Sequence, residues 1–528
     1  MRVLITGKVA EQGIKLLQAE HQVDLRYDLS QDELLSIIPG YHALVVQSET
    51  SVPAQLFEVA EDLKVIGCAG SGVNNIDLRA ATRKGVLVLN APDGNTIATS
   101  EYAFALLLAL ARNIPQAHGA VCAGKWDRSE LTGVEIKDKT LGVIGIGRIG
   151  SGVAQRALAF GMRVLAYDPF INEENAEELG VELVELERIY AEADFITLHI
   201  PLTAETRNML NEEAFSQMKK GVRIVHCSRG GIVDEAALLK AIQQGIVAGA
   251  AADVFEGESS HLDNPLLATG KVIFTPHIAS YTEEALVSVS VDVAEGILLA
   301  LREEAVPTAV NVPPVARDVA DFIRPYLHLA EKMGTLSVHL VDGRTEYVEI
   351  KYNGEIADMD CKMITTAAVK GILNPLLQEE VNYVNAQGVA RSRGIKVREV
   401  KMQEAEIFTN LISIHIRTDK GEHRVAGTIF GKEEPRIVMI DGIRVDIEPR
   451  GWLLIVPHQD SPGMIGKVGS LLGENQININ GMQVGRTEKV GTQIMVVSVG
   501  QNISDEILNQ LKGLDGISNP QVVYFNGL

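Results

Sequence analysis

The chain has 528 residues, enough for three or four domains of ordinary size, and a mean hydropathy of +0.10. Its formal net charge of −21 argues against nucleic acid and anionic membrane as partners, because both are themselves negatively charged. The longest apolar run, 103–111, is too short to cross a bilayer, and the first residues show no signal peptide. The few cysteines have no metal-ligand spacing, which predicts a cytoplasmic protein without a metal site and with reduced thiols at Cys68, Cys122, Cys227 and Cys361.

The N-terminal part of the chain alternates short apolar runs with helical patterns. In residues 1–95 the strands are expected at 2–6, 43–47, 64–67 and 86–89, and a long apolar helix follows at 96–112. Further on, strands are expected at 141–145, 163–167, 194–199, 222–227, 248–253 and 271–275. Strands that alternate with helices in this way predict an α/β fold with a doubly wound parallel sheet.

The C-terminal part has a different pattern. After a second long helix at 282–302, the proline-marked segment 306–314 is the clearest boundary in the chain. Antiparallel strands are then expected at 345–351, 396–402, 411–417 and 423–430, with a helical stretch at 363–387. The last unit shows the strand and helix order βαββαβ, which is typical of ferredoxin-like regulatory domains: 452–457, 463–474, 477–485, 490–498, 504–512 and 521–525.

A glycine motif, Gly145, Gly147 and Gly150, lies between an expected strand and an expected helix at 148–160. The first glycine permits a tight turn, the second lets the backbone approach a pyrophosphate, and the third lets the helix pack on the strand. Asp168 ends the next apolar run, where its carboxylate can accept hydrogen bonds from both ribose hydroxyls and would repel a 2′-phosphate. The motif therefore predicts NAD rather than NADP.

Three residues at or near strand ends are candidates for the chemistry. Oxidation of a 2-hydroxy acid by NAD needs a cation for the carboxylate and a base for the hydroxyl proton. The planar fork of Arg229 suits bidentate carboxylate binding, although a surface cation is the alternative. His277 is either the base or a structural histidine. Glu258 is either a solvated loop acid or the carboxylate that raises the pKa of His277 and orients its ring.

Together these residues resemble those of the D-2-hydroxyacid dehydrogenase family over residues 1–310. The resemblance rests on the glycine motif with Asp168, and on residues 227–234, 253–255, Glu258, Pro276 and His277. It implies a Rossmann-type NAD domain at 98–282, inserted into a flavodoxin-like substrate domain formed by 1–97 and 283–312. The active site would lie in the cleft between the two domains.

The resemblance also implies residue roles. Arg229 would anchor the substrate carboxylate, His277 would be the general acid and base, and Glu258 would support His277. The carboxylate would also receive backbone N–H groups from Gly70, Ser71, Gly72 and Val73. Besides the glycine motif and Asp168, the cofactor would contact Ser71, Arg148, Ile149, Ile200, Cys227, Ser228, Arg229, Asp253, His277 and Ala279.

Residues 313–528 resemble the two additional domains of the long-form D-3-phosphoglycerate dehydrogenases, an α+β intervening domain at 313–449 and a ferredoxin-like ACT domain at 450–528. The resemblance implies that L-serine is bound as effector by His458, Asp460 and Asn478. The alternative is an ACT domain that serves assembly alone. Because ACT domains pair, a homodimer or homotetramer is implied. In the intervening domain, an anion site or a solvated basic face would explain Lys370, Asn382 and Arg391.

The implied reaction is NAD-dependent oxidation of 3-phospho-D-glycerate to 3-phosphohydroxypyruvate, the first step of L-serine biosynthesis. Two alternatives stay open. One is another D-2-hydroxyacid dehydrogenase with an ACT tail, acting for example on 2-hydroxyglutarate or on glycerate and hydroxypyruvate. The other is a non-catalytic sensor of NAD or an amino acid.

Departures from the family pattern concern the substrate phosphate. Gln47 and Cys68 stand where the family has arginines that clamp the phosphate, and Glu49 adds a negative charge. Residues 278–281 read Ile-Ala-Ser-Tyr where Leu-Gly-Ala-Ser is usual. If the substrate carries a phosphate, other cations of this subunit or a neighbour must bind it, and the candidates are Lys8, Arg79 and Arg128.

Overall fold

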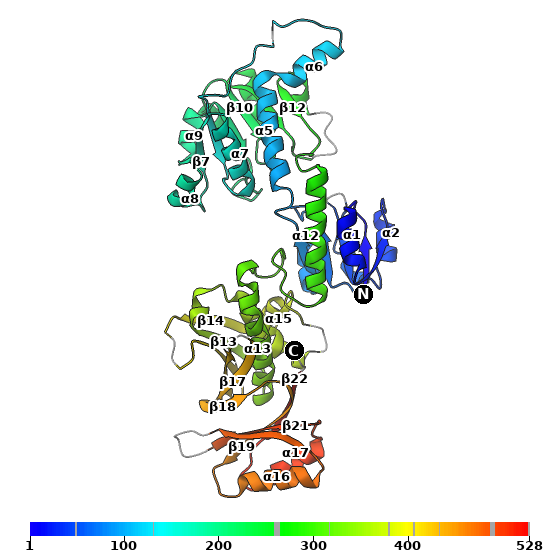
Figure 1. The fold of residues 1–528 in the computed structure, drawn as a ribbon, viewed down its shortest axis with the longest axis vertical. Coiled ribbons are helices and arrows are strands. Elements are labelled where there is room, and N and C mark those ends of the chain that lie inside the picture. The colour runs from blue at the N-terminus through cyan, green and yellow to red at the C-terminus, as the bar shows by residue number, and fades with distance from the viewer. Residues whose placement is uncertain are drawn as a thin grey trace.

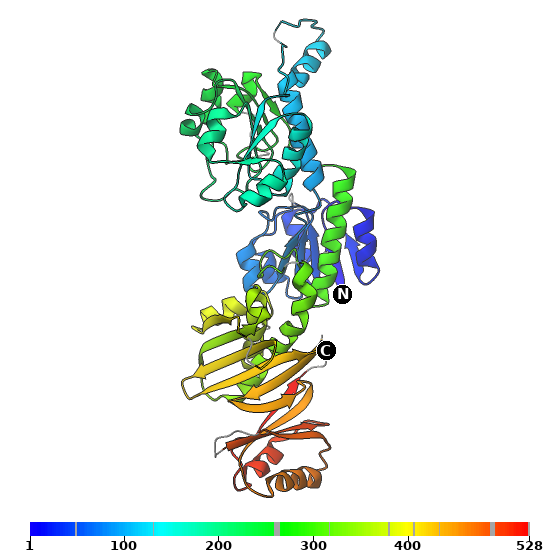
Figure 2. The same cartoon turned by 60° about the vertical axis from the view of Figure 1, so that its left-hand side comes forward.

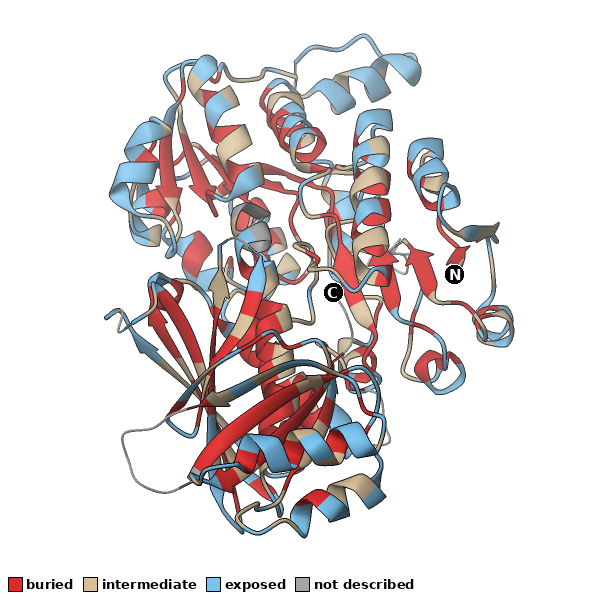
Figure 3. Cartoon of the chain, turned by 60° about the horizontal axis from the view of Figure 1, so that its bottom comes forward, coloured by how far each residue is buried: buried red, intermediate tan, exposed pale blue. Residues whose placement is uncertain are grey.

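Four sheet-containing units follow one another along an elongated molecule (Figure 1). The turned view keeps the same order, with the seven-stranded unit at one end and the last four strands at the other (Figure 2). The strands form the buried layers, and most helices expose one side (Figure 3). The computed structural model describes residues 1–47, 50–129, 131–257, 264–315, 317–377, 381–404, 407–431, 433–485 and 492–525.

A five-stranded parallel sheet with the order β2-β1-β3-β4-β5, the flavodoxin-like order, forms the first unit. Its strands are β1 (Arg2–Ile5), β2 (Gln22–Leu25), β3 (Ala43–Val46), β4 (Val65–Cys68) and β5 (Leu87–Asn90). One face is covered by α2 (Gln31–Ile37), α3 (Leu56–Val59) and α4 (Leu78–Arg83), and the other by α1 (Glu11–Gln18) and α12 (Glu283–Leu301). Because α12 follows the second unit in the sequence, the second unit is inserted into the first (Figure 1).

Seven parallel strands with the order β12-β11-β10-β9-β6-β7-β8 form the second unit. They are β6 (Thr140–Ile144), β7 (Arg163–Tyr167), β8 (Glu182–Leu183), β9 (Phe195–Leu198), β10 (Val222–His226), β11 (Val247–Ala252) and β12 (Val272–Phe274). The helices are α5 (Thr96–Arg112), α6 (Ile114–Cys122), α7 (Arg148–Ala159), α8 (Glu173–Glu178), α9 (Leu186–Glu192), α10 (Glu212–Ser216) and α11 (Glu235–Gln243). The strand order reverses between β6 and β9, and ligands bind at such a switch point. The predicted Rossmann-type fold is confirmed.

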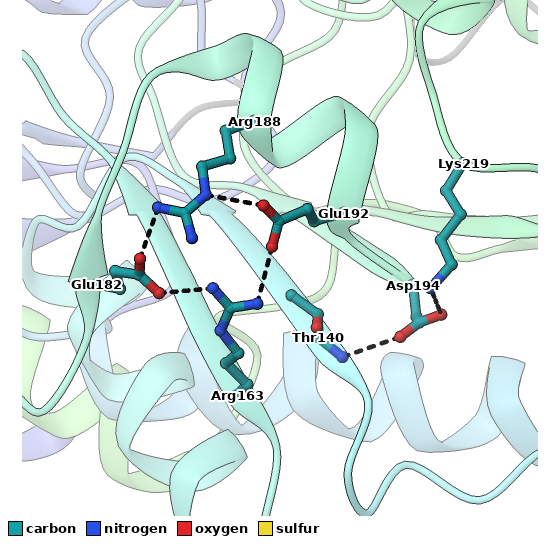
Figure 4. Close-up of polar contacts among 7 residues, drawn as sticks. All are labelled: Thr140, Arg163, Glu182, Arg188, Glu192, Asp194 and Lys219. Atoms are coloured by element: carbon teal, nitrogen blue, oxygen red, sulfur yellow. Dashed lines mark hydrogen bonds and ion pairs between the residues drawn. The ribbon is translucent and has the colours of Figure 1, made fainter.

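A closed ring of four ion pairs fastens the edge of this sheet (Figure 4). Arg163 of β7 pairs with Glu182 at 2.7 Å and Glu192 at 2.8 Å, and Arg188 pairs with the same two carboxylates at 2.6 and 2.8 Å. The two arginines lower the pKa of both carboxyl groups. Since Arg163 begins β7, the ring lies at the end of the strand away from Asp168 and has a structural role.

The third unit is a six-stranded sheet with the order β14-β13-β15-β16-β17-β18. Its strands are β13 (Thr345–Gly354), β14 (Lys396–Met402), β15 (Asn410–Thr418), β16 (Glu422–Phe430), β17 (Glu434–Ile440) and β18 (Ile443–Ile447), and its α-helices are α13 (Arg317–Leu340), α14 (Lys362–Leu373) and α15 (Ala386–Ser392). The expectation of antiparallel strands is wrong for one pair, because β13 and β14 run parallel. The helices between them provide the crossover that a parallel pair requires.

The last unit has the predicted βαββαβ order, with the strands arranged as β20-β21-β19-β22. Its elements are β19 (Gly451–Gln459), α16 (Met464–Glu474), β20 (Ile479–Gly485), β21 (Thr492–Val499), α17 (Asp505–Lys512) and β22 (Gln521–Phe525). The two helices cover one face of the sheet. The other face, including Leu453, Val496 and Phe525, shares a buried cluster with the third unit. These two units are therefore packed together through a common core.

The proline-marked segment runs along β5 as an antiparallel edge. Ala309 bridges to Leu89, and the Val310 N–H donates to the carbonyl oxygen of Val88 at 2.8 Å. This pairing covers an otherwise open edge strand. Within the described ranges no single helix is long and apolar enough to cross a membrane, and only the bent pair α5 and α6, which meet at 65°, passes that test together.

Candidate active site

The glycine motif forms the turn between β6 and α7, and each glycine meets a different requirement. Gly145 has φ +90°, and an added Cβ would lie 2.5 Å from the carbonyl oxygen of His199. A Cβ at Gly150 would lie 2.0 Å from the carbonyl oxygen of Gly145, so only glycine lets the helix approach the turn. A Cβ at Gly147, the N-cap of α7, would meet nothing within 4 Å. Gly147 therefore faces open space at a helix N-terminus, which fits a pyrophosphate.

Asp168 follows β7 directly and lies beside this turn. One carboxylate oxygen accepts the backbone N–H of Ile146 at 3.1 Å, and the other accepts that of Phe170 at 2.9 Å. These two bonds fix the carboxylate, and each oxygen keeps a second lone pair for a ribose hydroxyl. The arrangement fits NAD, with the dinucleotide lying from the open turn toward Asp168.

Arg148, the first residue of α7, forms an ion pair that the sequence did not predict. Its Nη1 atom lies 2.7 Å from the carboxylate of Asp93, in the segment between β5 and α5, and both side chains are exposed. This pair links the two units beside the pyrophosphate cradle. An exposed ion pair of this kind is worth little in stability, so a bound phosphate can replace Asp93 as the partner of Arg148.

The loop after β4 turns three successive carbonyl groups away from the cleft. The carbonyl of Gly70 accepts the Ala91 N–H at 2.9 Å, that of Ser71 accepts the Asn90 side chain at 2.7 Å, and that of Gly72 accepts the Cys68 thiol at 3.1 Å. Peptide N–H groups point opposite to the neighbouring carbonyls in such a loop. The expectation for Gly70 is wrong, because its N–H donates to the carbonyl of Cys68 at 2.8 Å. The loop can therefore offer the N–H groups of Ser71, Gly72 and Val73 to a carboxylate.

Arg229 brings the second unit to this loop. It follows β10, and its Nη2 atom lies 3.4 Å from the hydroxyl oxygen of Ser71 across the cleft. Its Nη1 atom donates to the carbonyl of Ser228 at 2.7 Å, which fixes the guanidinium. The structure thus places the predicted carboxylate cation against the predicted carboxylate loop.

His277 lies after β12, exposed and in a left-handed conformation with φ +53°. A residue other than glycine in this region costs about 1–3 kcal/mol, which the surroundings must offset. Fully buried Asp253 does so, since its carboxylate accepts the hydroxyl of Thr275 and the N–H groups of Ile278 and Ala279 at 3.0 and 2.9 Å. Asp253 therefore holds the loop that presents His277. Glu258 lies outside the described residues.

Two histidines at the ends of neighbouring strands, half-buried His199 and buried His226, were not predicted as functional. His199 follows β9 and His226 ends β10. Burial lowers the pKa of His199 to about 3 and that of His226 to about 4, because the charged imidazolium is disfavoured away from water. Both rings stay neutral at physiological pH, so neither adds positive charge to the cleft.

The remaining residues expected to contact NAD vary in exposure. Cys227, Ser228 and Ala279 are buried, with 6, 7 and 5 % of their surface exposed. Burial raises the pKa of the Cys227 thiol, which stays protonated. Ile200 packs against Gly145, where an added Cβ would lie 2.7 Å from the Ile200 side chain.

Gln47 and Cys68, the two residues that depart from the family pattern, both form hydrogen bonds within the protein. The Gln47 amide bonds to both backbone groups of Lys8, at 2.7 and 3.1 Å. Cys68 is 1 % exposed, and its thiol shapes the carboxylate loop through Gly72. Neither side chain is placed to bind a phosphate. Glu49 lies outside the described residues.

In the third unit the expected anion-binding residues have protein partners. Lys370 pairs with Glu331 at 2.9 Å and stacks over the ring of Tyr383 at 4.5 Å. Asn382 donates to the carbonyl of Gly85 in the first unit at 2.7 Å. Arg391 is exposed on α15. Lys370 is only 12 % exposed, so the alternative of a solvated basic face does not describe it.

The expected effector residues do not form one site within a single chain. His458 on β19 pairs with Gln493 on β21, whereas Ile479, beside Asn478, pairs with Val499. Six residues along β21 separate these positions, about 20 Å. Asp460, two residues after His458, is exposed. One chain thus provides the two halves of the expected site at opposite ends of its sheet.

His458 and Gln493 form a buried polar pair, 3 and 6 % exposed. His458 Nδ1 lies 3.0 Å from the carbonyl of Gln459, so Nδ1 is the donor in this hydrogen bond. Within the described part of the chain, His458 Nε2 and Gln493 Oε1 have no hydrogen-bond partner. Two unpaired buried polar atoms on paired strand residues favour a polar ligand.

The inserted Rossmann-type unit, the pyrophosphate cradle and the cleft with Arg229 and His277 define the class, an NAD-dependent D-2-hydroxyacid dehydrogenase. Residues 104–279 match the model of the D-isomer specific 2-hydroxyacid dehydrogenase NAD binding domain. Residues 322–441 match the D-3-phosphoglycerate dehydrogenase intervening domain, and 453–516 match the ACT domain. The D-lactate dehydrogenase of Aquifex aeolicus, solved with NAD and lactic acid, is 31% identical, has a TM-score of 0.51 and covers 57% of this chain and 95% of its own.

Relatives match nearly the whole chain. The D-3-phosphoglycerate dehydrogenase of Archaeoglobus fulgidus is 43% identical over 520 residues, 98% of each chain. That of Bacillus subtilis is 42% identical over 525 residues, 99% of each chain. The chain belongs to the family of D-3-phosphoglycerate dehydrogenases.

Proposed function

We propose that the protein oxidises 3-phospho-D-glycerate to 3-phosphohydroxypyruvate with NAD, as the first step of L-serine biosynthesis. The observation that carries this proposal is the approach of Arg229 to Ser71, 3.4 Å across the cleft. This contact brings the cation of Arg229 to the loop whose N–H groups can bind the carboxylate, beside the glycine turn for the cofactor. The similarity of all four units to phosphoglycerate dehydrogenases supports the choice of substrate.

The reaction uses groups from both units. Arg229 and the N–H groups of Ser71, Gly72 and Val73 bind the carboxylate and fix the substrate carbon that carries the hydroxyl. The imidazole of His277 takes the hydroxyl proton while the hydrogen on that carbon leaves with its electron pair. NAD, when bound, supplies the acceptor for this hydride. In the reverse direction His277 returns the proton to the carbonyl oxygen. Glu258 is proposed to support His277.

The test is formation of NADH and of the phosphorylated 2-oxo acid, identified by mass, from NAD and 3-phospho-D-glycerate. His277→Ala should lower kcat by about 100-fold or more, because it removes the base. Arg229→Gln should raise KM strongly, since the carboxylate loses its cation. Absence of NADH with the wild type contradicts the function, and a fully active His277→Ala variant contradicts the mechanism.

A second function, oxidation of another D-2-hydroxy acid, is favoured by one specific observation. Gln47 and Cys68 replace cations and are held by internal hydrogen bonds. Turnover of D-glycerate or 2-hydroxyglutarate at least as efficient as that of 3-phospho-D-glycerate would establish this alternative.

We also propose that L-serine is the effector and that two chains share its site in a homodimer or homotetramer. His458 Nε2 and Gln493 Oε1 would accept from the ammonium group, and Asp460 would add negative charge. Asn478 would come from the second chain, because its own His458 is about 20 Å away. Calorimetry should show L-serine binding that Asp460→Ala abolishes, and sedimentation should show no monomer. Absent heat or a monomer contradicts this proposal.

A cytoplasmic location is proposed from the thiols. Cys68, Cys227 and Cys361 are buried and Cys122 is exposed, all as free cysteines. Burial raises the pKa of Cys361 to about 11, so this thiol is protonated and unreactive. Cell fractionation checks the location.

A further inference from the structure

We infer that Lys8 binds the substrate phosphate and that Gln47 holds Lys8 in place for this role. The inference rests on the proposed function, in which the 2-hydroxy acid carries a phosphate at its far end. It answers how a chain without the two expected arginines can recognise that group. The carrying observation is the double hydrogen bond between the Gln47 side chain and the Lys8 backbone.

Lys8 lies at the same edge of the sheet as the carboxylate loop. The order β1-β3-β4 places the carboxyl ends of these parallel strands side by side, followed by Lys8, Gln47 and the carboxylate loop 70–73. Neighbouring strands are about 4.8 Å apart, so Lys8 starts about 10 Å from the loop. The substrate measures about 5 Å from carboxyl carbon to phosphorus, and a lysine side chain reaches about 6 Å. Substrate and side chain together span the distance.

The Gln47 amide is uncharged, and both of its polar atoms bond to the Lys8 backbone. Its Oε1 accepts the Lys8 N–H at 3.1 Å, and its Nε2 donates to the Lys8 carbonyl at 2.7 Å. Gly7 permits this approach, because an added Cβ would lie 2.7 Å from Gln47 Cγ. Asn75 donates to the Gln47 carbonyl at 2.9 Å and ties the segment to β4. Gln47 is therefore a positioning residue. The positive charge for the phosphate comes from Lys8, which follows the neighbouring strand β1.

Lys8 is an exposed cation near the end of β1. Its side chain is exposed and forms no ion pair with any residue that the structure describes. By contrast, Lys84 in the same unit pairs with Glu58 at 3.3 Å. Arg79 is the second residue of α4, whose N-cap is Asp77. The segment after α6, which contains Arg128, lies at the far end of the second unit (Figure 1).

The experiment compares kcat/KM for 3-phospho-D-glycerate and D-glycerate in the full-length enzyme. Lys8→Met should lower the value for the phosphorylated substrate about 10- to 100-fold, because one charge-assisted contact is lost. The value for D-glycerate should stay within about twofold, since the contact does not exist there. Lys8→Arg should keep most of the activity. Lys84→Met, which removes an equal charge elsewhere, should change neither substrate.

The outcomes separate this inference from the proposed function. A wild type that prefers 3-phospho-D-glycerate, with a Lys8→Met variant that keeps the preference, overturns the role of Lys8 and leaves the function standing. Equal losses on both substrates also overturn it, because Lys8 would then act on the common part of the site. A wild type without preference overturns the function and this inference together. Thermal unfolding should be the same for all variants, because Lys8 is exposed.

Discussion

The Nδ2 atom of Asn90 donates a 2.7 Å hydrogen bond to the carbonyl oxygen of Ser71. The backbone N–H of the same residue donates to Thr308 in the linker at 3.2 Å, and Asn90 is only 8 % exposed. The carboxylate loop is thus held by a residue that lies behind it, between the loop and the linker that leads to the C-terminal units.

Replacing Asn90 should therefore weaken substrate binding. Asn90→Ala leaves the Ser71 carbonyl without its donor, and KM for the hydroxy acid should rise about 5- to 30-fold. KM for NAD should stay unchanged. Asn90→Asp has the same shape but cannot donate, so it should act in the same direction. If both variants lose thermal stability but keep the wild-type KM for the hydroxy acid, the residue only supports the fold.

The glycine turn provides a matched pair of substitutions. Gly150→Ala places a Cβ 2.0 Å from a backbone oxygen and should destabilise the free protein by about 2 kcal/mol or more. Gly147→Ala meets no atom within 4 Å, so it should leave stability unchanged and weaken NAD binding about tenfold or more. Thermal unfolding and NAD titration measure the two effects. Equal NAD affinity in wild type and Gly147→Ala would place the pyrophosphate elsewhere.

The Asp93–Arg148 ion pair should compete with the cofactor. Asp93→Asn frees Arg148 and should tighten NAD binding by up to about fivefold, an effect that salt reduces. Asp62→Asn, at an exposed site in the same unit, is the control. Fluorescence titration at low and high salt checks the prediction, and an unchanged Kd at low salt contradicts it.

Two histidines with lowered pKa values, His199 and His226, predict acid sensitivity. His199 and His226 have lowered pKa values in the folded protein, so the unfolded chain binds more protons below about pH 6.5. Their stabilising contribution is complete above that pH and is lost as the pH falls toward about 4. His226→Asn should therefore reduce the loss of unfolding free energy between about pH 7 and 5 by about 1–3 kcal/mol. Urea unfolding at both pH values measures this. A variant as acid-sensitive as the wild type would show that His226 is not responsible.

The sequence predicted best what depends on local requirements. The glycine turn and the helix after it follow from the steric needs of a few neighbouring residues. The structure confirms this helix as α7, Arg148–Ala159. The buried parallel strands were recognisable from their apolar runs for the same reason.

Four of the described strands were not predicted: β2, β8, β17 and β18, although β17 contains the apolar run 437–440. The edge strand β2 (Gln22–Leu25) alternates polar and apolar residues over four positions only, and β8 (Glu182–Leu183) has two residues. The parallel pairing of β13 and β14 was predictable from the helices between them, but the pattern was interpreted as antiparallel.

Contacts between distant residues could not be predicted from one sequence. Asn90 and Asp93 follow a strand end, which marks them as candidates, but no local pattern names Ser71 or Arg148 as their partners. For Asn478 the sequence predicted a contact that a single chain does not make. The motif suggested one site with His458, but the strand register separates the two residues.

The most direct test of the whole account is the wild-type ratio of kcat/KM for 3-phospho-D-glycerate to that for D-glycerate, with NAD as acceptor. The account predicts a ratio of about 100 or more, because the two substrates differ only in a dianionic group that the enzyme binds by charge-assisted contacts. A ratio near one would contradict it, since the cleft would then select only the hydroxy acid and not its phosphate.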